Sequence, residues 1–419
     1  MRIILLGAGR SGLGAARLLA QDKKIILINE KAFPEQEELE ALGVTVLIQD
    51  FESFDFKCDD LIYKAPGIAE SAFFPKTYNE IDLVAEYAPQ YDLYAVSGTN
   101  GKTTTTTLLN AMLNRQFPSF AAGNIGYSLS QSIVDHGDMA AKVALEISAF
   151  QMDGVKNARF EIYALMNLTP DHLDRYGNEK AYYNAKMKIF PYTKQLILNY
   201  DDANIMSEIS QKTLPEKCYY LSLKERKDIY LENDAIYFHE TKLFNLADLH
   251  LIGTHNLYNA AFAATMAYLA GVEVKEIQKV LQNFSGVPHR MEYVDTIEGV
   301  AFYNDSKGTN PEATQVCLQS FDNIHWLAGG YDEGNDFATL IKEKAHIKKA
   351  YFYGASAQKL QKHFPEAKIY PDLKAAFKAA VSQAEALDNI VLSPACASYD
   401  QYDNFEQRGE EFKKLVKTL

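Results

Sequence analysis

The sequence predicts a mixed α/β protein with three domains: a Rossmann-like N-terminal domain, a P-loop-type central domain and a Rossmann-like C-terminal domain. The chain has 419 residues, too many for one hydrophobic core. Two glycine-rich turns, at 7–12 and 98–103, each lie between a strand-like run and a helix-like run. Gly286–Val287–Pro288 then interrupts the pattern before another α/β alternation begins. We expect domains at 1–91, 92–287 and 288–419.

Composition narrows the class of partner. The net charge is -13, which argues against nucleic acid as the main partner, because binding a polyanion requires many Lys and Arg contacts. No apolar run is long enough to cross a bilayer, so we expect no membrane partner. The cysteines are scattered without a CxxC pair, which fits a reducing cytoplasm and predicts neither a zinc cage nor a disulfide framework: Cys58, Cys218, Cys317 and Cys396.

The first glycine turn follows the strand-like run Arg2–Leu6 and precedes the helix-like run Leu13–Ala20. Gly7, Gly9 and Gly12 match GxGxxG, and the next strand-like run, Ile25–Asn29, ends near Glu30, where a ribose-binding acid lies in dinucleotide folds. The pattern alone suggests NAD. The motif provides only a tight turn that places a diphosphate at a helix N-terminus, so any nucleotide diphosphate fits, UDP included.

The second glycine turn, Val96–Thr104, follows the apolar run Leu93–Val96. Its backbone amides can surround phosphate oxygens, Lys102 can reach the terminal phosphates and Thr103 can bind Mg²⁺. The full GxxxxGK[ST] pattern has a glycine where this chain has Val96, so we expect a shortened loop. The stretch predicts a nucleoside triphosphate site.

Polar residues follow two strand-like runs of the central part. Glu146 follows Val143–Leu145, and Asn167 follows Ile162–Met166. Carboxyl ends of parallel strands share one edge of a sheet, so we expect both residues to converge on Lys102 and Thr103. Glu146 is then a candidate metal ligand. His172 could complete the Mg²⁺ shell, or it could simply belong to a helix N-cap region; the pattern leaves both open.

The last third repeats the strand-and-polar-end pattern. Strand-like runs at 300–303, 324–327, 350–353 and 390–392 end in segments rich in glycine, hydroxyls and one lysine. These ends predict an anion pocket, although some of the residues are expected to be only turn residues and N-caps.

Segments in all three predicted domains carry a family resemblance: Ser97–Thr103, Gly123–Gly126, Glu146–Ser148 with Phe150 and Gln151, Asn167–Tyr176, Gly253–Asn256, His289–Arg290, Asn304–Asn310 and Leu392–Gly409. They resemble the Mur ligases of peptidoglycan synthesis. Asn304–Asn310 and Leu392–Gly409 are similar to the branch that adds D-glutamate to UDP-N-acetylmuramoyl-L-alanine (UDP-MurNAc-L-Ala). The resemblance implies an ATP-dependent, cytoplasmic amide ligase that works through an acyl phosphate, and we expect it to be a monomer.

The resemblance implies ligands for particular residues, and it turns the first glycine turn into a UDP site. The UDP substrate would contact Gly9, Ser11, Gly12, Glu30 and Lys31, and its muramoyl part Gly123, Asn124 and Ser148. The ATP phosphates would contact Gly98, Thr99, Asn100, Gly101, Lys102, Thr103 and Thr104. Magnesium, with two sites expected, would be held by Thr103, Glu146, His172 and a carbamylated Lys186.

For the remaining ligands, the resemblance implies residues on both sides of the second boundary. The base and ribose would meet Asn256, Asn259, Arg290 and Asp305, and D-glutamate would meet Lys307, Thr309, Ser398 and Phe405. This chain departs from the family at Glu333, where a basic residue often contacts the distal carboxylate of glutamate. The expected catalytic residues are Lys102, His172 and Lys186, with His172 also a conceivable base for the amine.

Three rival functions remain: a ligase of the same fold with other substrates, an NAD-dependent dehydrogenase using the first glycine turn, and a non-catalytic nucleotide-binding protein. The dehydrogenase hypothesis gives the second glycine turn no role. The hypothesis of a non-catalytic protein does not explain why a full set of candidate residues is present: Lys102, Thr103, Glu146, His172, Lys186 and Lys307.

Overall fold

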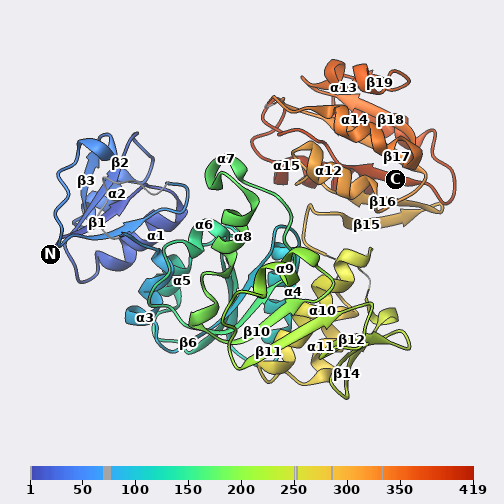
Figure 1. Cartoon of the computed structure of the whole chain (residues 1–419). Helices are drawn as coiled ribbons and strands as arrows, with labels where there is room; N and C mark the ends of the chain where they lie inside the picture. The colour runs from blue at the N-terminus through green and yellow to red at the C-terminus, as the bar shows by residue number, and fades with distance from the viewer. Residues whose placement is uncertain (1, 69–76, 250, 252, 285, 333) are drawn as a thin grey trace. The chain divides into compact units, whose positions relative to one another are not determined.

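The computed structural model describes residues 2–68, 77–249, 251, 253–284, 286–332 and 334–419 (Figure 1). Contacts divide the chain into two compact units. Unit 1 is Met1–His250 with Thr254–Phe284, and unit 2 is Leu251–Gly253 with Ser285–Leu419. Unit 1 contains two β-sheets and unit 2 contains one.

The first sheet of unit 1 is parallel, with strand order β3-β2-β1-β4-β5. Its central strand β1 is buried along its whole length, as expected for a parallel sheet covered on both faces. The elements are β1 Ile3–Leu6, α1 Arg10–Leu19, β2 Ile25–Asn29, α2 Gln36–Ala41, β3 Thr45–Ile48, a 3₁₀ turn Phe51–Ser53, β4 Leu61–Lys64 and β5 Thr77–Tyr78.

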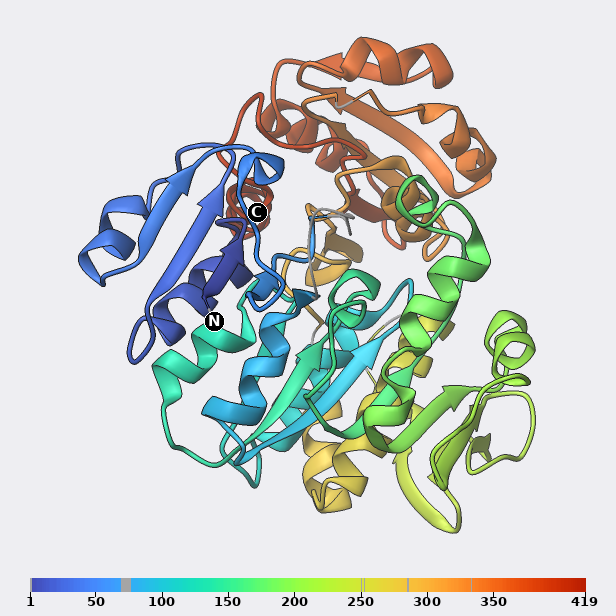
Figure 2. The ribbon, with the colours of Figure 1, turned by 60° about the vertical axis from the view of Figure 1, so that its left-hand side comes forward.

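Helix α1 packs against α5 (Leu129–His136), which belongs to the second sheet's helices; both helices can be followed in Figure 2. A Cβ on Gly14 of α1 would lie 2.4 Å from Ser128 Oγ, so the two helices approach closely only because Gly14 has no side chain. This contact joins the first sheet to the rest of unit 1.

The second sheet has the order β14-β13-β12-β11-β10-β9-β6-β8-β7. In this order the strands from β7 to β12 pair in parallel, and β13 pairs antiparallel with both β12 and β14. The strands are β6 Tyr91–Ser97, β7 Ser119–Gly123, β8 Ala141–Glu146, β9 Phe160–Leu165, β10 Thr193–Asn199, β11 Lys217–Ser222, β12 Ile229–Glu232, β13 Ala235–Phe238 and β14 Thr241–Asn245.

The helices of unit 1 outside the first sheet are α3 Val84–Tyr87, α4 Lys102–Leu113, α5 Leu129–His136, α6 Ala149–Met152, α7 Leu173–Tyr176, α8 Glu179–Met187, α9 Ala203–Ile209, α10 Thr254–Leu269 and α11 Val274–Leu281, with 3₁₀ turns at Glu80–Leu83, Phe190–Tyr192 and Leu246–Asp248. Helix α10 packs against α4, and an apolar cluster that includes Leu108 and Phe262 forms between them. The phosphate-loop helix is thereby fixed in the core of unit 1.

The sheet of unit 2 has the order β15-β16-β20-β17-β18-β19; β15 is antiparallel to β16, and the other pairs named here are parallel. Its strands are β15 Glu292–Ile297, β16 Val300–Asn304, β17 Ile324–Gly329, β18 Ile347–Tyr353, β19 Lys368–Tyr370 and β20 Asn389–Leu392. Its helices are α12 Pro311–Leu318, α13 Ala357–His363, α14 Leu373–Val381 and α15 Phe405–Val416, with a 3₁₀ segment Phe337–His346.

The bounds of two helices have local causes. Helix α4 begins at Lys102, because Gly101 is left-handed (φ 83°) and serves as the N-cap. Helix α8 ends at Met187, before a 3₁₀ turn that contains Pro191, a residue that lacks the N–H needed to continue an α-helix. In the described part of the chain, no helix is both long and apolar enough to cross a membrane.

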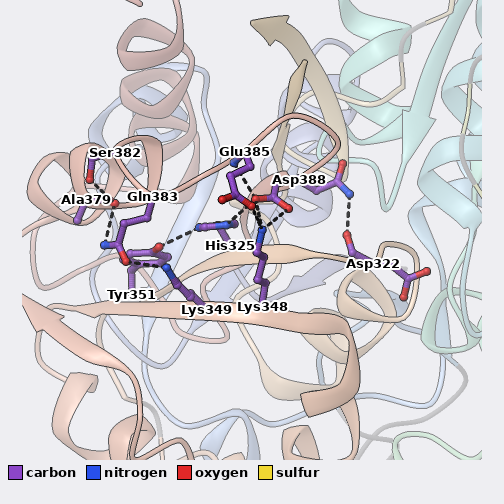
Figure 3. A network of polar contacts seen from close by, with 11 residues as sticks. Asp322, His325, Lys348, Lys349, Tyr351, Ala379, Ser382, Gln383, Glu385 and Asp388 are labelled. Atoms are coloured by element: carbon purple, nitrogen blue, oxygen red, sulfur yellow. Dashed lines mark hydrogen bonds and ion pairs between the residues drawn. The ribbon is translucent and has the colours of Figure 1, made fainter. Parts of the chain in front are cut away.

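A buried polar network lies at the amino ends of the strands in unit 2 (Figure 3). His325 Nε2 lies 3.1 Å from Asp388 Oδ2, and His325 Nδ1 lies 2.8 Å from Tyr351 Oη. Asp388 also accepts hydrogen bonds from Lys348 Nζ (2.9 and 3.0 Å) and the Glu385 N–H (2.8 Å). Each of these charged side chains therefore has several partners.

Candidate active site

The phosphate loop is held by the end of β9. The Asn100 N–H donates to Asn167 Oδ1 at 2.8 Å, and Asn167 Nδ2 donates back to the Asn100 carbonyl at 3.0 Å. The Thr99 N–H donates to the Asn167 carbonyl at 3.1 Å. Gly98 and Gly101 take positive φ values, 158° and 83°, that turn the backbone around this contact. The predicted convergence of Asn167 on the loop is confirmed.

The residue after Asn167 is fixed from a third strand end. The Leu168 N–H donates to Asp202 Oδ2 at 3.0 Å, and Asn204 Nδ2 donates to the Leu168 carbonyl at 2.8 Å. Thr99 Oγ1 donates to the Thr169 carbonyl at 3.1 Å. The loop therefore has its shape set by side chains on rigid elements, which limits the entropy cost of binding a ligand.

Two lysines meet at one carbonyl of this loop. Lys102 Nζ donates to the Gly98 and Thr99 carbonyls at 2.9 and 2.8 Å, and Lys186 Nζ donates to the Gly98 carbonyl at 3.0 Å. Lys186, from α8, is almost completely buried and lies 4.8 Å from the centre of the Tyr182 ring. Burial, and then the positive charge of Lys102, lower the pKa of Lys186 well below its usual value.

Glu146 ends β8 beside the loop and is buried. Its Oε1 accepts a hydrogen bond from Asn124 Nδ2 at 2.9 Å. Its Oε2 is buried and has no hydrogen-bond partner among the residues that the structure describes. The Asn124 N–H also donates to the Glu146 carbonyl, and a Cβ on Gly123 would lie 2.2 Å from that carbonyl oxygen, so Gly123 and Asn124 wrap tightly around the strand end.

A buried carboxylate oxygen without a donor is costly unless a cation or donor meets it, and Glu146 Oε2 is such an oxygen. Within the described ranges, no group of three His, Cys, Asp or Glu side chains forms a metal cluster. Magnesium rarely needs one, because it binds through one or two carboxylates and takes waters and phosphate oxygens for the rest. The Glu146 carboxylate and the Thr103 hydroxyl therefore fit a nucleotide-bound Mg²⁺.

His172 lies in a group of aromatic rings. Its ring centre is 4.8 Å from that of Phe150 and 5.9 Å from that of Tyr182, and its Nε2 is 3.5 Å from Asp171 Oδ2. Its backbone is left-handed (φ 51°), an uncommon conformation for a residue with a side chain, and it precedes α7 without capping that helix through its side chain. His172 thus occupies the predicted N-cap position, while its imidazole remains half exposed.

Helix α10 places its first-turn asparagines at the phosphate loop. A Cβ on Gly101 would lie 2.3 Å from Asn259 Oδ1, and Asn259 Nδ2 donates to Asn256 Oδ1 at 3.0 Å. Both side chains are buried. The pair lies on the side of Gly101 away from solvent, and it explains why residue 101 must be glycine.

In the first sheet, the glycine turn is as tight as predicted. A Cβ on Gly12 would lie 1.9 Å from the Gly7 carbonyl oxygen. Gly9 is the N-cap of α1 and provides no side-chain cap, so Ser11 and its neighbours begin the helix without one. Glu30 and Lys31 lie exposed directly after β2.

Ser148 has a structural contact of its own. It caps α6 in a reciprocal capping box with Gln151, and its hydroxyl lies 3.0 Å from Gln151 Oε1. Gly126 faces the first sheet, since a Cβ there would lie 3.1 Å from Arg10 Nη1. The segment expected to hold the muramoyl part therefore lies against the start of α1.

Unit 2 contains the other candidate residues. Asp305, after β16, is buried and accepts from Ser393 Oγ at 2.7 Å and the Met291 N–H at 3.1 Å. Burial raises its pKa to about 6. Arg290 Nε is buried and makes no hydrogen bond within the described part of the chain.

The predicted amino-acid pocket residues come from three segments of unit 2. Lys307 Nζ lies 5.7 Å from the centre of the Phe405 ring. Thr309 lies two residues further along, and its N–H donates to the Lys307 carbonyl at 2.9 Å. Ser398 is buried, and the strand-like bridge Tyr331–Ala397 pairs its segment with the turn after β17. Glu333 lies outside the described residues.

Sequence comparison bears on the whole chain. Residues 96–267 match the Mur ligase middle domain, and residues 289–396 match the Mur ligase glutamate ligase domain. A UDP-N-acetylmuramoylalanine–D-glutamate ligase of Caldanaerobacter subterraneus is 38% identical over 449 residues, covering 100% of this chain and 98% of the relative. The enzyme of the same name from Geobacillus sp. is 36% identical, covering 100% and 98%.

This chain is a member of the Mur ligase family. Solved structures agree at the level of fold. MurC from Thermotoga maritima, a UDP-N-acetylmuramate–alanine ligase, has a TM-score of 0.59 at 17% identity and covers 100% of this chain and 99% of its own. MurF ligase from the same organism, solved in complex with ADP, has a TM-score of 0.60 at 17% identity, with 96% and 98% covered. The mixed α/β fold with mostly parallel sheets is therefore a Mur ligase fold.

Two arginines in this Mur ligase were missed as site residues from sequence. Arg408 of α15 is fully buried, and its guanidinium donates to Ser306 Oγ (3.0 Å) and to the carbonyls of Ser306, Gly329, Cys396 and Ala397 (2.9–3.4 Å). It holds together the ends of β16, β17 and β20, which carry the predicted pocket residues. The second, Arg175, follows His172 by three positions. The helical spacing of buried residues in α15, where Arg408 lies one turn before Phe412, could have indicated that Arg408 is buried. Nothing in the sequence indicates the partners of Arg175.

Proposed function

We propose that this protein is an ATP-dependent ligase that joins D-glutamate to UDP-MurNAc-L-Ala in the cytoplasmic synthesis of peptidoglycan precursors. The observation that carries the proposal is similarity over the full chain, at 33–38% identity, to enzymes with the name UDP-N-acetylmuramoylalanine–D-glutamate ligase. The geometry around Lys102, Lys186 and Glu146 supports the chemistry. We propose that the active form is a monomer with domains at 1–91, 92–287 and 288–419.

The first chemical step would be activation of a carboxylate. A carboxylate oxygen is a poor leaving group, so the L-alanyl carboxylate would attack the γ-phosphorus of ATP to give an acyl phosphate and ADP. Lys102, at the start of α4, would donate to the transferring phosphoryl group, and the loop amides at 98–104 would hold the other phosphates. Bound Mg²⁺ would supply further neutralisation of phosphate charge.

The second step would be attack by the amine of D-glutamate on the acyl carbonyl, followed by loss of phosphate. Lys307, Thr309, Ser398 and Phe405 are the proposed glutamate contacts. The ammonium must lose a proton before it attacks. The imidazole of His172 is proposed as a metal ligand, and its one free lone pair would accept that proton only where it does not bind the metal. Asn256, Asn259, Arg290 and Asp305 are proposed for the nucleoside of ATP.

The UDP substrate is proposed to bind at the first sheet through Gly9, Ser11, Gly12, Glu30 and Lys31. The turn at Gly7 and Gly12 is too tight for side chains, which suits close approach by a diphosphate. Gly123, Asn124 and Ser148 are proposed for the muramoyl part. The contacts of Asn124 with Glu146 would then connect this substrate to the metal ligand.

We further propose that two Mg²⁺ ions are held by Thr103, Glu146, His172 and Lys186 after Lys186 reacts with CO₂. Only a neutral amine attacks CO₂, and the lowered pKa of buried Lys186 supplies one at neutral pH. Carbamylation converts the amine to a carboxylate. A carbonyl signal from ¹³C-bicarbonate that appears in the wild type and is missing from Lys186→Met tests it; a signal that persists in the variant contradicts it.

The reaction is tested by measuring phosphate release from ATP with UDP-MurNAc-L-Ala and a panel of L- and D-amino acids. We expect stimulation by D-glutamate and transfer of ¹⁸O from the alanyl carboxyl into the released phosphate. Lys102→Ala should lower turnover by about 10²–10³-fold, the usual cost of removing one charge-stabilising donor. Stimulation by another amino acid instead, or phosphate without label, would contradict the proposal.

A further inference from the structure

Arg175 of α7 makes contacts on two sides, one with the backbone after β4 and one with an aromatic ring. On one side, its Nη1 donates to the carbonyls of Pro66 (2.8 Å) and Gly67 (3.3 Å), and its Nη2 donates to that of Ile68 (3.3 Å). These carbonyls follow β4 of the first sheet and lie more than 100 positions away in sequence. The guanidinium is therefore a long-range connection within unit 1.

On its other side, the guanidinium stacks on an aromatic ring. Arg175 Cζ is 4.1 Å from the centre of the Phe150 ring, within the range of a cation–π interaction. The same Phe150 ring lies 4.8 Å from the His172 ring and stacks on Tyr176 at 5.8 Å. Arg175 thus fixes the ring that supports the imidazole of His172.

The carbonyls that Arg175 holds belong to a turn beside the first glycine turn. A Cβ on Gly7 would lie 3.0 Å from Ile68 Cδ1 and 3.1 Å from the Ala65 Cβ. The Ala65 N–H also donates to the Leu6 carbonyl at 2.9 Å. A nucleotide diphosphate seated on the glycine turn would therefore meet a surface whose position depends on residues 65–68.

We infer that Arg175 is a positioning residue that couples the binding of the UDP substrate at the first sheet to the placement of His172 at the metal site. The inference rests on the proposed function, which assigns these two ligands to these two places. Substrate that contacts the turn at 65–68 holds Arg175 in place, and Arg175 in turn holds Phe150 and His172. A flexible lysine could not replace the arginine, because only the planar fork reaches several carbonyls and stacks on a ring at once.

Coupling between two ligands is reciprocal and can be measured at equilibrium, without turnover. Calorimetry would give the Kd of UDP-MurNAc-L-Ala with and without Mg²⁺ and ADP. In the wild type we expect Mg²⁺ and ADP to tighten substrate binding by about 5–10-fold. In Arg175→Lys the ratio should fall to about 1, and the Mg²⁺ concentration for half-maximal activity should rise by roughly tenfold, as for other residues that orient metal ligands.

Arg159 provides the matched control. It also donates to two carbonyls, of Asn157 (2.9 Å) and Ala158 (3.0 Å), and lies 5.0 Å from the centre of the Tyr192 ring, but both carbonyls belong to residues close to it in sequence. Arg159→Lys should leave the coupling unchanged. Phe150→Leu keeps an apolar side chain and removes the ring, so it should reduce the coupling and serves if Arg175→Lys fails to melt cooperatively.

The outcomes separate the inference from the proposed function. A wild-type protein that does not bind UDP-MurNAc-L-Ala overturns the proposed function, and this inference with it. Wild-type binding without coupling, unchanged coupling in Arg175→Lys, or an equal loss in Arg159→Lys overturns the inference alone.

Discussion

Two buried polar groups of this protein contrast in how well their partners satisfy them. At the carboxyl edge of the second sheet, buried Lys186 donates to the Gly98 carbonyl, which it shares with Lys102, and Glu146 Oε2 has no partner within the described residues. At the amino edge of the third sheet, Asp388 accepts from Lys348, His325 and the Glu385 N–H (Figure 3).

The two sheet edges therefore have different roles. Burial alone would raise the pKa of Asp388, but the hydrogen bonds from Lys348, the Glu385 N–H and His325 outweigh it and leave the pKa below its usual value. For Lys186, burial and the positive charge of Lys102 outweigh the negative charges of Asp171 and Glu146 and lower the pKa. A satisfied buried charge supports the fold, whereas an unsatisfied one marks a place where a ligand binds.

The largest expected effect is on activity, from Lys186→Met. Removing the amine removes the proposed metal-binding carbamate, so turnover should fall by about 10³-fold or more, comparable to losing a principal charge-stabilising group. The free energy of unfolding should rise by about 1–3 kcal/mol, because an apolar side chain replaces a poorly satisfied buried polar one. Steady-state turnover and urea denaturation measure the two. A less stable variant would mean that Lys186 is a structural residue like Asp388.

The next largest effect is expected from Glu146→Gln. Its turnover should be lowered about 10–100-fold, and it should require a higher Mg²⁺ concentration. The Asn124 hydrogen bond to Oε1 can persist, so the melting temperature should change little. Mg²⁺ titrations of activity, together with melting curves, would check this. Glu161→Gln is the control, because Glu161 forms an ion pair with Lys194 away from the loop. An unchanged Mg²⁺ requirement would remove Glu146 from the metal site.

Asp388→Asn should show the opposite pattern. The free energy of unfolding should fall by about 2 kcal/mol, because Lys348 and His325 lose their shared acceptor charge. Turnover per folded molecule should be unchanged. Denaturation curves and kcat on the same samples decide it, and a loss of kcat without a loss of stability would show that the amino edge contributes to catalysis.

The smallest expected effect is a change in pH dependence, from His325→Gln. Burial is the main reason that the pKa of His325 lies below its usual value, so the unfolded chain binds the extra proton more readily. Its contribution to stability is then present above about pH 6.5, the usual value, and decreases as the pH falls below it.

Melting temperatures between pH 5 and 8 would therefore fall less steeply on the acid side in His325→Gln than in the wild type. The charged and polar groups facing His325 are Asp388, Lys348, Lys349 and Tyr351, and they are unchanged in the variant. Parallel curves for the two proteins would show that His325 keeps its usual pKa.

Much of the phosphate-loop edge could be predicted from sequence because its information is local. Lys102 follows β6 and a glycine turn, and Glu146 and Asn167 lie at the ends of β8 and β9, the two parallel neighbours of β6, so the rule for strand ends brings them together. Strand β2 was predicted to the residue for the same reason: its apolar run and its boundaries are adjacent in sequence.

Contacts between distant segments could not be predicted in this way. Neither periodicity nor a motif says that Arg175 reaches Pro66, that Asn259 packs against Gly101, or that Asp388 meets Lys348. These pairings depend on how whole elements pack. The burial that gives Lys186 its low pKa is likewise a property of the assembled unit, and the residue itself was singled out only by resemblance.

The strand order of the third sheet has a consequence for synthesis of the chain. Strand β20, formed by Asn389–Leu392, pairs with both β16 and β17, which come much earlier in sequence. A ribosome must therefore release the chain as far as Leu392 before this sheet can close, and Arg408 can lock its strand ends only afterwards. Until then β16 and β17 expose the edges that β20 later pairs, so we expect chaperones to bind this unit during translation.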